Sequence, residues 1–109
     1  MTINHNYYLH LAFQIAEKNL GQTGLNPSVG SIVVKNNSII SSGVTSNKGR
    51  PHSEFNALNK IKKTTSLSLY TTLEPCTHYG LTPPCTNIII KKGIKNVFYA
   101  FEDPDIRTF

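Results

Sequence analysis

The 109-residue sequence is poor in sulfur-containing residues and has no long hydrophobic run. It contains two cysteines, one methionine and no tryptophan. No apolar stretch approaches the roughly 18 residues that a membrane-spanning helix needs, and the N-terminal residues show no basic segment followed by an apolar one. These absences exclude such a helix and predict a cytoplasmic protein without a membrane partner. In that reducing compartment, two cysteines are more often metal ligands or inert thiols than a disulfide.

Charged residues are also sparse, at 16% of the chain, and only six residues are acidic, so the formal net charge is +5. Such an excess is compatible with a nucleic-acid surface or with attraction to anionic substrates. Lysines near the end of a helix, however, stabilise the helix dipole, and five lie where two helices are expected to end: Lys62, Lys63, Lys91, Lys92 and Lys95. The charge therefore does not by itself predict binding to nucleic acid.

The composition predicts one globular domain that spans residues 1–109. Hydrophobic residues make up 39% of the chain, which is ordinary for a globular protein and argues against disorder or a coiled coil. No repeat, low-complexity segment or internal linker divides the sequence. A chain of this length buries enough surface for a hydrophobic core.

Hydrophobic spacing and turn residues predict the element order αββαβαβ. The expected elements are a helix over 5–20, a hairpin within 31–44 that turns at 35–37, a helix over 52–63, a strand over 67–73, a helix from Pro84 to about Lys92, and a strand over 96–101. A helix between two strands makes those strands parallel, whereas a hairpin is antiparallel. The pattern predicts an α/β sandwich with helices packed on a sheet and the site in loops that follow strands.

Three potential metal ligands surround a proline-rich segment. His52 begins the second predicted helix, Cys76 follows a strand, and Cys85 follows two prolines at the start of the third helix. A catalytic zinc takes three protein ligands of these types and keeps a fourth position open for water. The start of a helix also favours a thiolate. This arrangement predicts a zinc site formed by His52, Cys76 and Cys85.

Glu54 stands two residues after His52 and is expected to reach the same pocket. Zinc lowers the pKa of a bound water from about 15.7 toward 7. A neighbouring carboxylate is then suited to move protons from that water to a ring nitrogen and to a departing amine, a contribution of typically about 10²- to 10⁴-fold in rate. We therefore predict that Glu54 is the general acid and base.

The combination of these motifs resembles the cytidine-deaminase-like zinc deaminases, whose signature is His-x-Glu followed by Pro-Cys and a second Cys. Within them, the sequence is similar to the deaminase of riboflavin biosynthesis from about Tyr8 to Pro104. Residues 77–84 separate the two cysteines, whereas nucleic-acid editing deaminases usually have two residues there. The segments that carry the resemblance are "NPSVG", "GRPHSE", "TLEPCTHYG" and "TPPCTNIII".

The resemblance implies a three-layer α/β/α sandwich with a mixed sheet, and a role for individual residues. It implies that His52, Cys76 and Cys85 bind zinc and that Glu54 shuttles protons. The substrate would be 2,5-diamino-6-ribosylamino-4(3H)-pyrimidinone 5′-phosphate, and substrate contacts would come from Asn26 and His78.

Two positions depart from the pattern of this deaminase. A histidine that the family often has corresponds to about Thr45 or Ser46 here, so either a hydroxyl replaces it or its contact is lost. The common basic residue before the Thr-Pro-Pro-Cys segment is Leu81, and a cation there would help to hold a phosphate. We expect Arg50 or Lys48, beside His52, to compensate.

The resemblance also has implications for partners. The family continues beyond "DP" with a further helix and strand, and some members add a reductase domain. A chain that ends at Phe109 is expected to lack these elements, to pass its product to a separate reductase, and to leave the strand over 96–101 at a sheet edge. Related deaminases are commonly dimers or tetramers, so a homo-oligomer is one expected state.

Several alternatives stay open at the level of sequence. The zinc could be structural, with His78 as a fourth ligand, in an inactive or truncated binding module. The positive charge would favour a nucleoside or tRNA deaminase instead. Glu54 alone would be interpreted as a solvated carboxylate at a helix start, and Asn26 before Pro27 as a turn residue.

Overall fold

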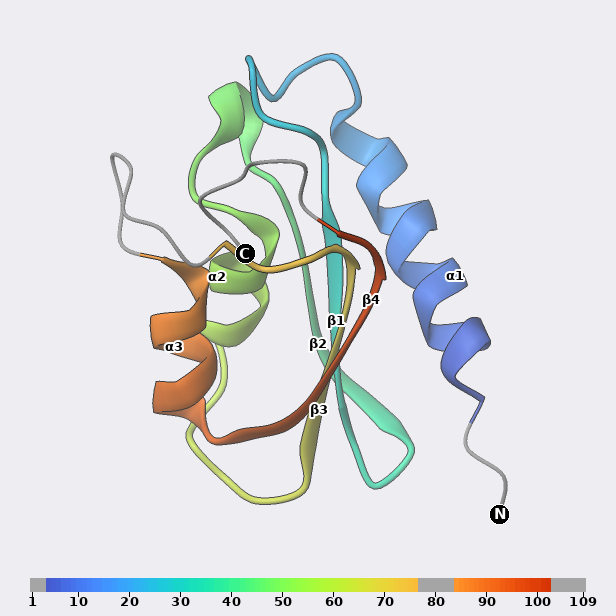
Figure 1. The fold of residues 1–109 in the computed structure, drawn as a ribbon, viewed down its shortest axis with the longest axis vertical. Coiled ribbons are helices and arrows are strands. Elements are labelled where there is room, and N and C mark those ends of the chain that lie inside the picture. The colour runs from blue at the N-terminus through green and yellow to red at the C-terminus, as the bar shows by residue number, and fades with distance from the viewer. Residues whose placement is uncertain (1–3, 77–83, 103–109) are drawn as a thin grey trace.

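The computed structural model describes residues 4–76 and 84–102, which form a four-stranded sheet between two helical layers (Figure 1). Helix α1 covers one face of the sheet, and helices α2 and α3 cover the other. The elements are α1 His5–Ala16, β1 Gly30–Lys35, β2 Ser38–Val44, α2 Ser53–Leu58, β3 Leu67–Leu73, α3 Cys85–Lys92 and β4 Ile94–Phe101, with short 3₁₀ turns at Glu17–Asn19 and Asn47–Gly49. The predicted order and the three-layer α/β/α sandwich are confirmed.

The strands lie in the order β2-β1-β3-β4, and the sheet is mixed as predicted. Strand β1 pairs antiparallel with both β2 and β3, and β3 pairs parallel with β4 across the α3 connection. The hairpin turns at Asn36 and Asn37, which have φ angles of 49° and 65°. Both values lie in the left-handed region, which suits a two-residue hairpin turn that follows the twist of the strands.

Alternating side chains of β1 divide the core into two parts. Ile32 and Val34 face α1 and pack with Tyr8 and Tyr70, whereas Val33 packs on the other face with residues of α2, β3 and α3. This period of two is the expected pattern for a strand covered on both faces. The strand is therefore buried at the centre of the molecule and fixes the positions of the helices on either side.

A glycine allows helix α2 to lie directly on strand β2. A Cβ atom built at Gly43 would come within 2.5 Å of the Ser53 carbonyl oxygen and of the Ala57 amide nitrogen. No real Cβ contact is that short, so a larger residue would push α2 away. Because α2 follows His52 directly, Gly43 also determines where that histidine lies.

Two predicted helix ends are wrong. Helix α1 ends at Ala16 and continues as a 3₁₀ turn, and α2 ends at Leu58 instead of Lys63. The Ile61 amide bonds to the Leu58 carbonyl, and Ile61 packs against the core from this turn, which reproduces the helical spacing of apolar residues without a helix. No helix in the described part of the chain is long and apolar enough to cross a membrane.

Of the five lysines that were expected at helix ends, two lie there and three do not. Lys91 and Lys92 lie in the last turn of α3, as predicted. Lys62 and Lys63 lie beyond α2, and Lys95 belongs to β4, so the helix-dipole explanation is wrong for these three. Among the described strands, β4 lies at the sheet edge, as predicted, and exposes Val97, Tyr99 and Phe101.

Candidate metal centre and active site

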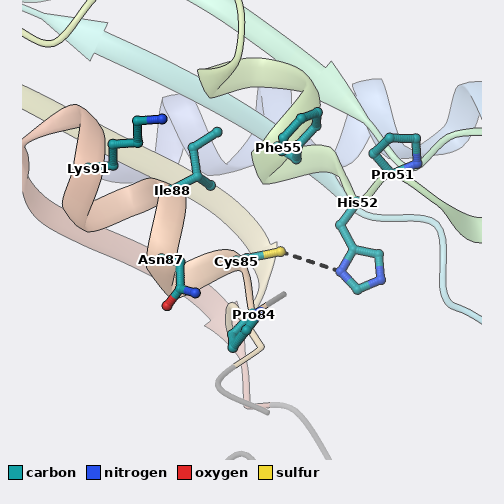
Figure 2. A pocket seen from close by; sticks show the side chains of 8 residues that line it. All are labelled: Pro51, His52, Phe55, Pro84, Cys85, Asn87, Ile88 and Lys91. Atoms are coloured by element: carbon teal, nitrogen blue, oxygen red, sulfur yellow. Dashed lines mark hydrogen bonds between the residues drawn. The ribbon is translucent and has the colours of Figure 1, made fainter. Parts of the chain in front are cut away.

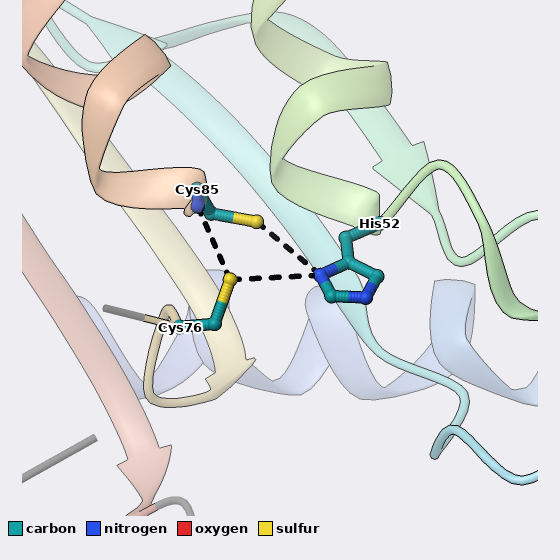
Figure 3. A group of neighbouring side chains, drawn as sticks. All are labelled: His52, Cys76 and Cys85. Carbon is teal, nitrogen blue, oxygen red and sulfur yellow. Dashed lines mark hydrogen bonds between the residues drawn. The ribbon is translucent and has the colours of Figure 1, made fainter. Parts of the chain in front are cut away.

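Three separate segments bring His52, Cys76 and Cys85 together (Figure 3). His52 is the N-cap residue of α2, Cys85 is the first residue of α3, and Cys76 follows the end of β3. His52 and Pro84 both have extended backbone angles, so each helix begins abruptly beside the cluster. The predicted site after a strand is thus correct for Cys76, while the other two side chains come from helix starts.

The distances within this group fit a tetrahedral metal site. His52 Nδ1 lies 3.4 Å from Cys85 Sγ and 3.8 Å from Cys76 Sγ, and all three potential ligand atoms lie within 4.8 Å of one another. Zn–N and Zn–S bonds of normal length in a tetrahedron place nitrogen and sulfur about 3.6 Å apart. One imidazole and two thiolates form a ligand set that zinc prefers, so these residues fit a zinc ion.

The pKa of Cys76 is about 4, well below that of an ordinary thiol. The main cause is a hydrogen bond from the Cys85 thiol, and the His52 ring and the Cys85 amide, whose nitrogen lies 3.1 Å from the sulfur, contribute further. The same contact and burial raise the pKa of Cys85, and the bond to Cys76 raises the pKa of His52. One sulfur therefore carries a negative charge that attracts a cation to the group.

Glu54 is the second residue of α2, and only 4% of its surface is exposed. It follows His52 by two residues, and its negative charge helps to raise the pKa of that histidine. Burial raises the pKa of Glu54, although a hydrogen bond from the Ser53 hydroxyl, 2.8 Å from Oε1, acts in the opposite direction. The interpretation of Glu54 as a solvated carboxylate is therefore wrong.

A pocket of about 490 Å³ runs along α2 and α3 beside His52 and Cys85 (Figure 2). Phe55 and Ile88 form apolar walls and Lys91 lies farther along α3; the remaining lining residues are Pro51, Pro84 and Asn87. Glu54, Asn26 and Thr45 are not among the described residues that line it. This volume is within the range of small-molecule sites, and it adjoins the metal group from the side of the two helices.

The side chain of Asn26 supports the segment that leads to His52. Its Nδ2 donates to the Gly49 carbonyl oxygen at 3.0 Å, and the Thr23 hydroxyl donates to the Asn26 carbonyl oxygen. Gly49 has a φ of 96°, a conformation that favours glycine. Asn26 thus has the structural role of the alternative interpretation, and its contact with a substrate stays a prediction.

The other predicted substrate contacts differ in their surroundings. Thr45 is 1% exposed, and its Oγ1 accepts a hydrogen bond from the Val29 amide at 2.9 Å, so the hydroxyl stabilises the chain at the end of β2. Arg50 is exposed and precedes His52 by two residues, and its charge acts to lower the pKa of that histidine. Its substrate role, like that of Thr45, stays a prediction. His78 and Leu81 lie outside the described residues.

Sequence reasoning missed the hydroxyl groups around Glu54. Ser53 occupies the middle of the His-x-Glu motif, and Ser31 Oγ lies 2.8 Å from Ser53 Oγ. The first of these neighbours could have been suspected from the sequence, because it is adjacent to Glu54. The second could not, because only the packing of α2 on β1 brings it there.

Comparison with known families identifies the class of this fold and site. The family model described as "Cytidine and deoxycytidylate deaminase zinc-binding region" matches residues 2–101. The chain therefore belongs to this zinc-binding deaminase family.

Individual relatives show which members of this family the chain is similar to. The "Riboflavin biosynthesis protein RibD" of Bacillus amyloliquefaciens is 46% identical over 100 residues, which are 91% of this chain and 27% of that protein. The "Diaminohydroxyphosphoribosylamino-pyrimidine deaminase" of Buchnera aphidicola subsp. Acyrthosiphon pisum is 39% identical over 104 residues, or 94% of this chain and 71% of the relative. The chain thus spans about a quarter of the first protein and most of the second.

A solved structure extends the similarity to three dimensions. The "diaminohydroxyphosphoribosylaminopyrimidine deaminase/ 5-amino-6-(5-phosphoribosylamino)uracil reductase" of Thermotoga maritima superimposes with a TM-score of 0.88 at 38% identity. The match covers 96% of this chain and 31% of that one. The predicted resemblance to the deaminases of riboflavin biosynthesis is confirmed.

Proposed function

We propose that this chain catalyses the zinc-dependent hydrolytic deamination of 2,5-diamino-6-ribosylamino-4(3H)-pyrimidinone 5′-phosphate in riboflavin biosynthesis. The observation that carries the proposal is a buried carboxylate, Glu54, two residues after the histidine of a His-Cys-Cys group with zinc-like spacing. Similarity to the Buchnera deaminase, most of which this chain spans, supports this substrate over other pyrimidines.

His52, Cys76 and Cys85 would hold the zinc, through Nδ1 and two thiolate sulfurs. When bound, the ion would act as a Lewis acid that lowers the pKa of water. The low pKa of Cys76 means that one ligand is already ionised at neutral pH, and the Cys85 thiol, whose pKa is raised, releases its proton as the metal binds.

Glu54 would carry both protons of the reaction. Its carboxylate accepts a proton from the attacking water as the new carbon–oxygen bond forms, and it gives that proton to the adjacent ring nitrogen. It then transfers the second proton of the former water to the exocyclic amine, the carbon–nitrogen bond breaks, and ammonia leaves. Burial raises the pKa of Glu54, which brings it closer to the operating pH that an acid and base catalyst needs.

Substrate contacts belong to the same proposal. Asn26, His78 and Thr45 would contact the substrate. The Thr45 hydroxyl would be held in place by the bond that it accepts from the Val29 amide. Arg50 is exposed and close to His52, so its guanidinium is suited to bind the 5′-phosphate. The product would pass to a separate reductase. A homo-oligomeric state, the absence of nucleic-acid binding and a cytoplasmic location remain predictions.

Ammonia release from this ribotide by the zinc-loaded protein tests the proposal, with Glu54→Gln as the matched variant. We expect turnover by the parent, and zinc retention with turnover reduced by at least about 10³-fold in the variant. Retained turnover by Glu54→Gln would exclude the proton-transfer role. Release of ammonia from deoxycytidylate or tRNA but not from the ribotide would instead support a nucleotide or RNA deaminase. A folded, zinc-bearing parent that deaminates none of them would support a noncatalytic zinc module.

A further inference from the structure

The residue between His52 and Glu54 is a serine with no exposed surface. Its hydroxyl donates to Glu54 Oε1 at 2.8 Å. A hydrogen bond to a charged group is stronger than one between neutral groups, and a low-dielectric interior strengthens it further. Ser53 therefore makes a directional contact with the carboxylate to which we assign the proton transfers.

Ser53 is itself held by a second serine on the central strand. Ser31 Oγ lies 2.8 Å from Ser53 Oγ, and because the Ser53 proton is directed at Glu54, Ser31 is the donor in this contact. Ser31 is the second residue of β1, and it also has no exposed surface. The position of the Ser53 hydroxyl therefore depends on the sheet as well as on its own helix.

A third hydroxyl completes the connection. Ser31 Oγ also lies 3.0 Å from Thr71 Oγ1, to which its single proton can turn instead, and these residues are direct partners in the antiparallel pairing of β1 with β3. Thr71 has no exposed surface either. A continuous line of hydroxyls, Thr71, Ser31 and Ser53, thus runs from the middle of the sheet to Glu54; we call it the hydroxyl chain.

Such a chain constrains geometry because burial leaves it no alternative partners in solvent. Within residues 4–76 and 84–102, no buried side-chain nitrogen or oxygen lacks a hydrogen-bond partner. Rotation of the Ser53 hydroxyl away from Glu54 would break a bond that water cannot replace, and leaving a buried polar group unpaired costs about 1–3 kcal/mol. The carboxylate is therefore tied to two strands that pair with each other in the sheet.

We propose that Ser53 is a positioning residue, which with Ser31 and Thr71 holds the Glu54 carboxylate in the orientation needed for both proton transfers. This inference rests on the proposed function of Glu54. Ser53, Ser31 and Thr71 are not among the described residues that line the pocket or form the metal group. The effect of the hydroxyl chain reaches the reaction through the carboxylate, which has to serve the attacking water first and the leaving amine afterwards.

The kinetic test compares Ser53→Ala, Ser53→Thr and Ser31→Ala in the zinc-loaded protein. Misplacing a catalytic group by about 1 Å costs up to about 100-fold in rate, so Ser53→Ala should lower kcat by about 10- to 100-fold with KM and bound zinc unchanged. Ser31→Ala should lower kcat less, and Ser53→Thr, which keeps the hydroxyl, should restore most of it. An unchanged kcat in folded Ser53→Ala, or a higher KM alone, would overturn the proposal.

Ser41→Ala is the matched control. The Ser41 hydroxyl donates to the Ala57 carbonyl oxygen at 2.6 Å, so this variant also removes a serine that bonds to α2 but makes no hydrogen bond to Glu54. It should lower the denaturant midpoint without lowering kcat. If Ser41→Ala reduced kcat as much as Ser53→Ala did, general loosening of α2 would explain both results.

A second measurement does not depend on activity. Denaturant midpoints of Ser53→Ala, Glu54→Ala and the double variant form a cycle that reports the Ser53–Glu54 interaction, because alanine at either position removes the hydrogen bond. We expect the two shifts to be non-additive, and additive shifts would overturn the inferred constraint. Non-additive shifts in a protein that fails to deaminate the ribotide would contradict the proposed function and leave the constraint on Glu54 in place.

Discussion

The backbone amide of Cys85 points at the sulfur of Cys76, with 3.1 Å between nitrogen and sulfur. The first residue of α3 thus stabilises a thiolate that approaches from the end of β3. It also contributes its own sulfur to the group, 3.4 Å from His52 Nδ1. One residue therefore provides a potential ligand and lowers the pKa of a second one.

Replacing either cysteine should remove the metal. We expect Cys76→Ala and Cys85→Ala to bind zinc at least about 10²-fold more weakly, because three protein ligands become two. Metal content after gel filtration and competition with a chromogenic chelator would measure this. His10→Ala, which changes an exposed histidine of α1, is the control and should bind zinc normally. Tight zinc binding by both cysteine variants would contradict the assigned ligands.

Zinc binding at neutral pH should release a proton from Cys85 and few from Cys76. The pKa of Cys85 is raised, so this thiol holds a proton that the metal displaces, whereas the pKa of about 4 leaves Cys76 already ionised. Zinc affinity should therefore fall as the pH is lowered toward 5. Calorimetry in buffers of different ionisation enthalpy would count the protons.

The matched comparison is between the two thiols. Cys85→Ser should reduce the number of protons released on zinc binding, and Cys76→Ser should leave it nearly unchanged. The opposite result would mean that Cys85 is the ionised sulfur.

Glu54→Gln should stabilise the fold at neutral pH. A carboxyl group whose pKa is raised in the folded state binds a proton more tightly there than in the unfolded state, so its ionised form destabilises the fold above the unfolded pKa of about 4.5. A neutral amide removes that cost and still accepts a bond from Ser53. Thermal unfolding at pH 7 and at pH 4 should show the gain shrinking at the lower pH. A loss of stability at pH 7 would contradict this expectation.

Gly43→Ala should displace α2 and weaken the metal group. The new Cβ would overlap backbone atoms of Ser53 and Ala57, and overpacking of this kind costs about 1–3 kcal/mol. We expect a lower free energy of unfolding and weaker zinc binding. Gly21→Ala is the control, since a Cβ there has nothing within 4 Å although φ is 80°. It should cost about 1 kcal/mol through backbone strain and leave zinc affinity unchanged.

The sequence was sufficient for the element order and for the metal group because both depend on local signals. Apolar spacing distinguishes helices from strands, and cysteine or histidine at the start of a helix is visible in the chain itself. The end of α2 was wrong because Ile61 enters the core from a turn that preserves helical spacing. The spacing of apolar residues cannot distinguish a helix that continues to Ile61 from a turn that places Ile61 in the core.

The surroundings of the site depended on contacts between distant segments. The bond between the Thr45 hydroxyl and the Val29 amide spans 16 residues, and the contact between Ser31 and Thr71 spans 40. These pairs are fixed by sheet register and by the approach of α2 to the sheet. No spacing rule in the sequence reports them, so the structure was needed to find the residues that hold Glu54.

The group of His52, Cys76 and Cys85 also joins parts of the chain that are far apart in sequence, 24 and 33 residues for the two contacts of the imidazole. An ion bound there would link three distant segments at once. Because the unfolded chain does not hold these ligands together, the free energy of metal binding would stabilise the folded state. Helix α3 begins at this junction, so its amide protons should exchange faster with solvent when the ion is removed. Metal occupancy would then set the local stability of the crossover between the two parallel strands.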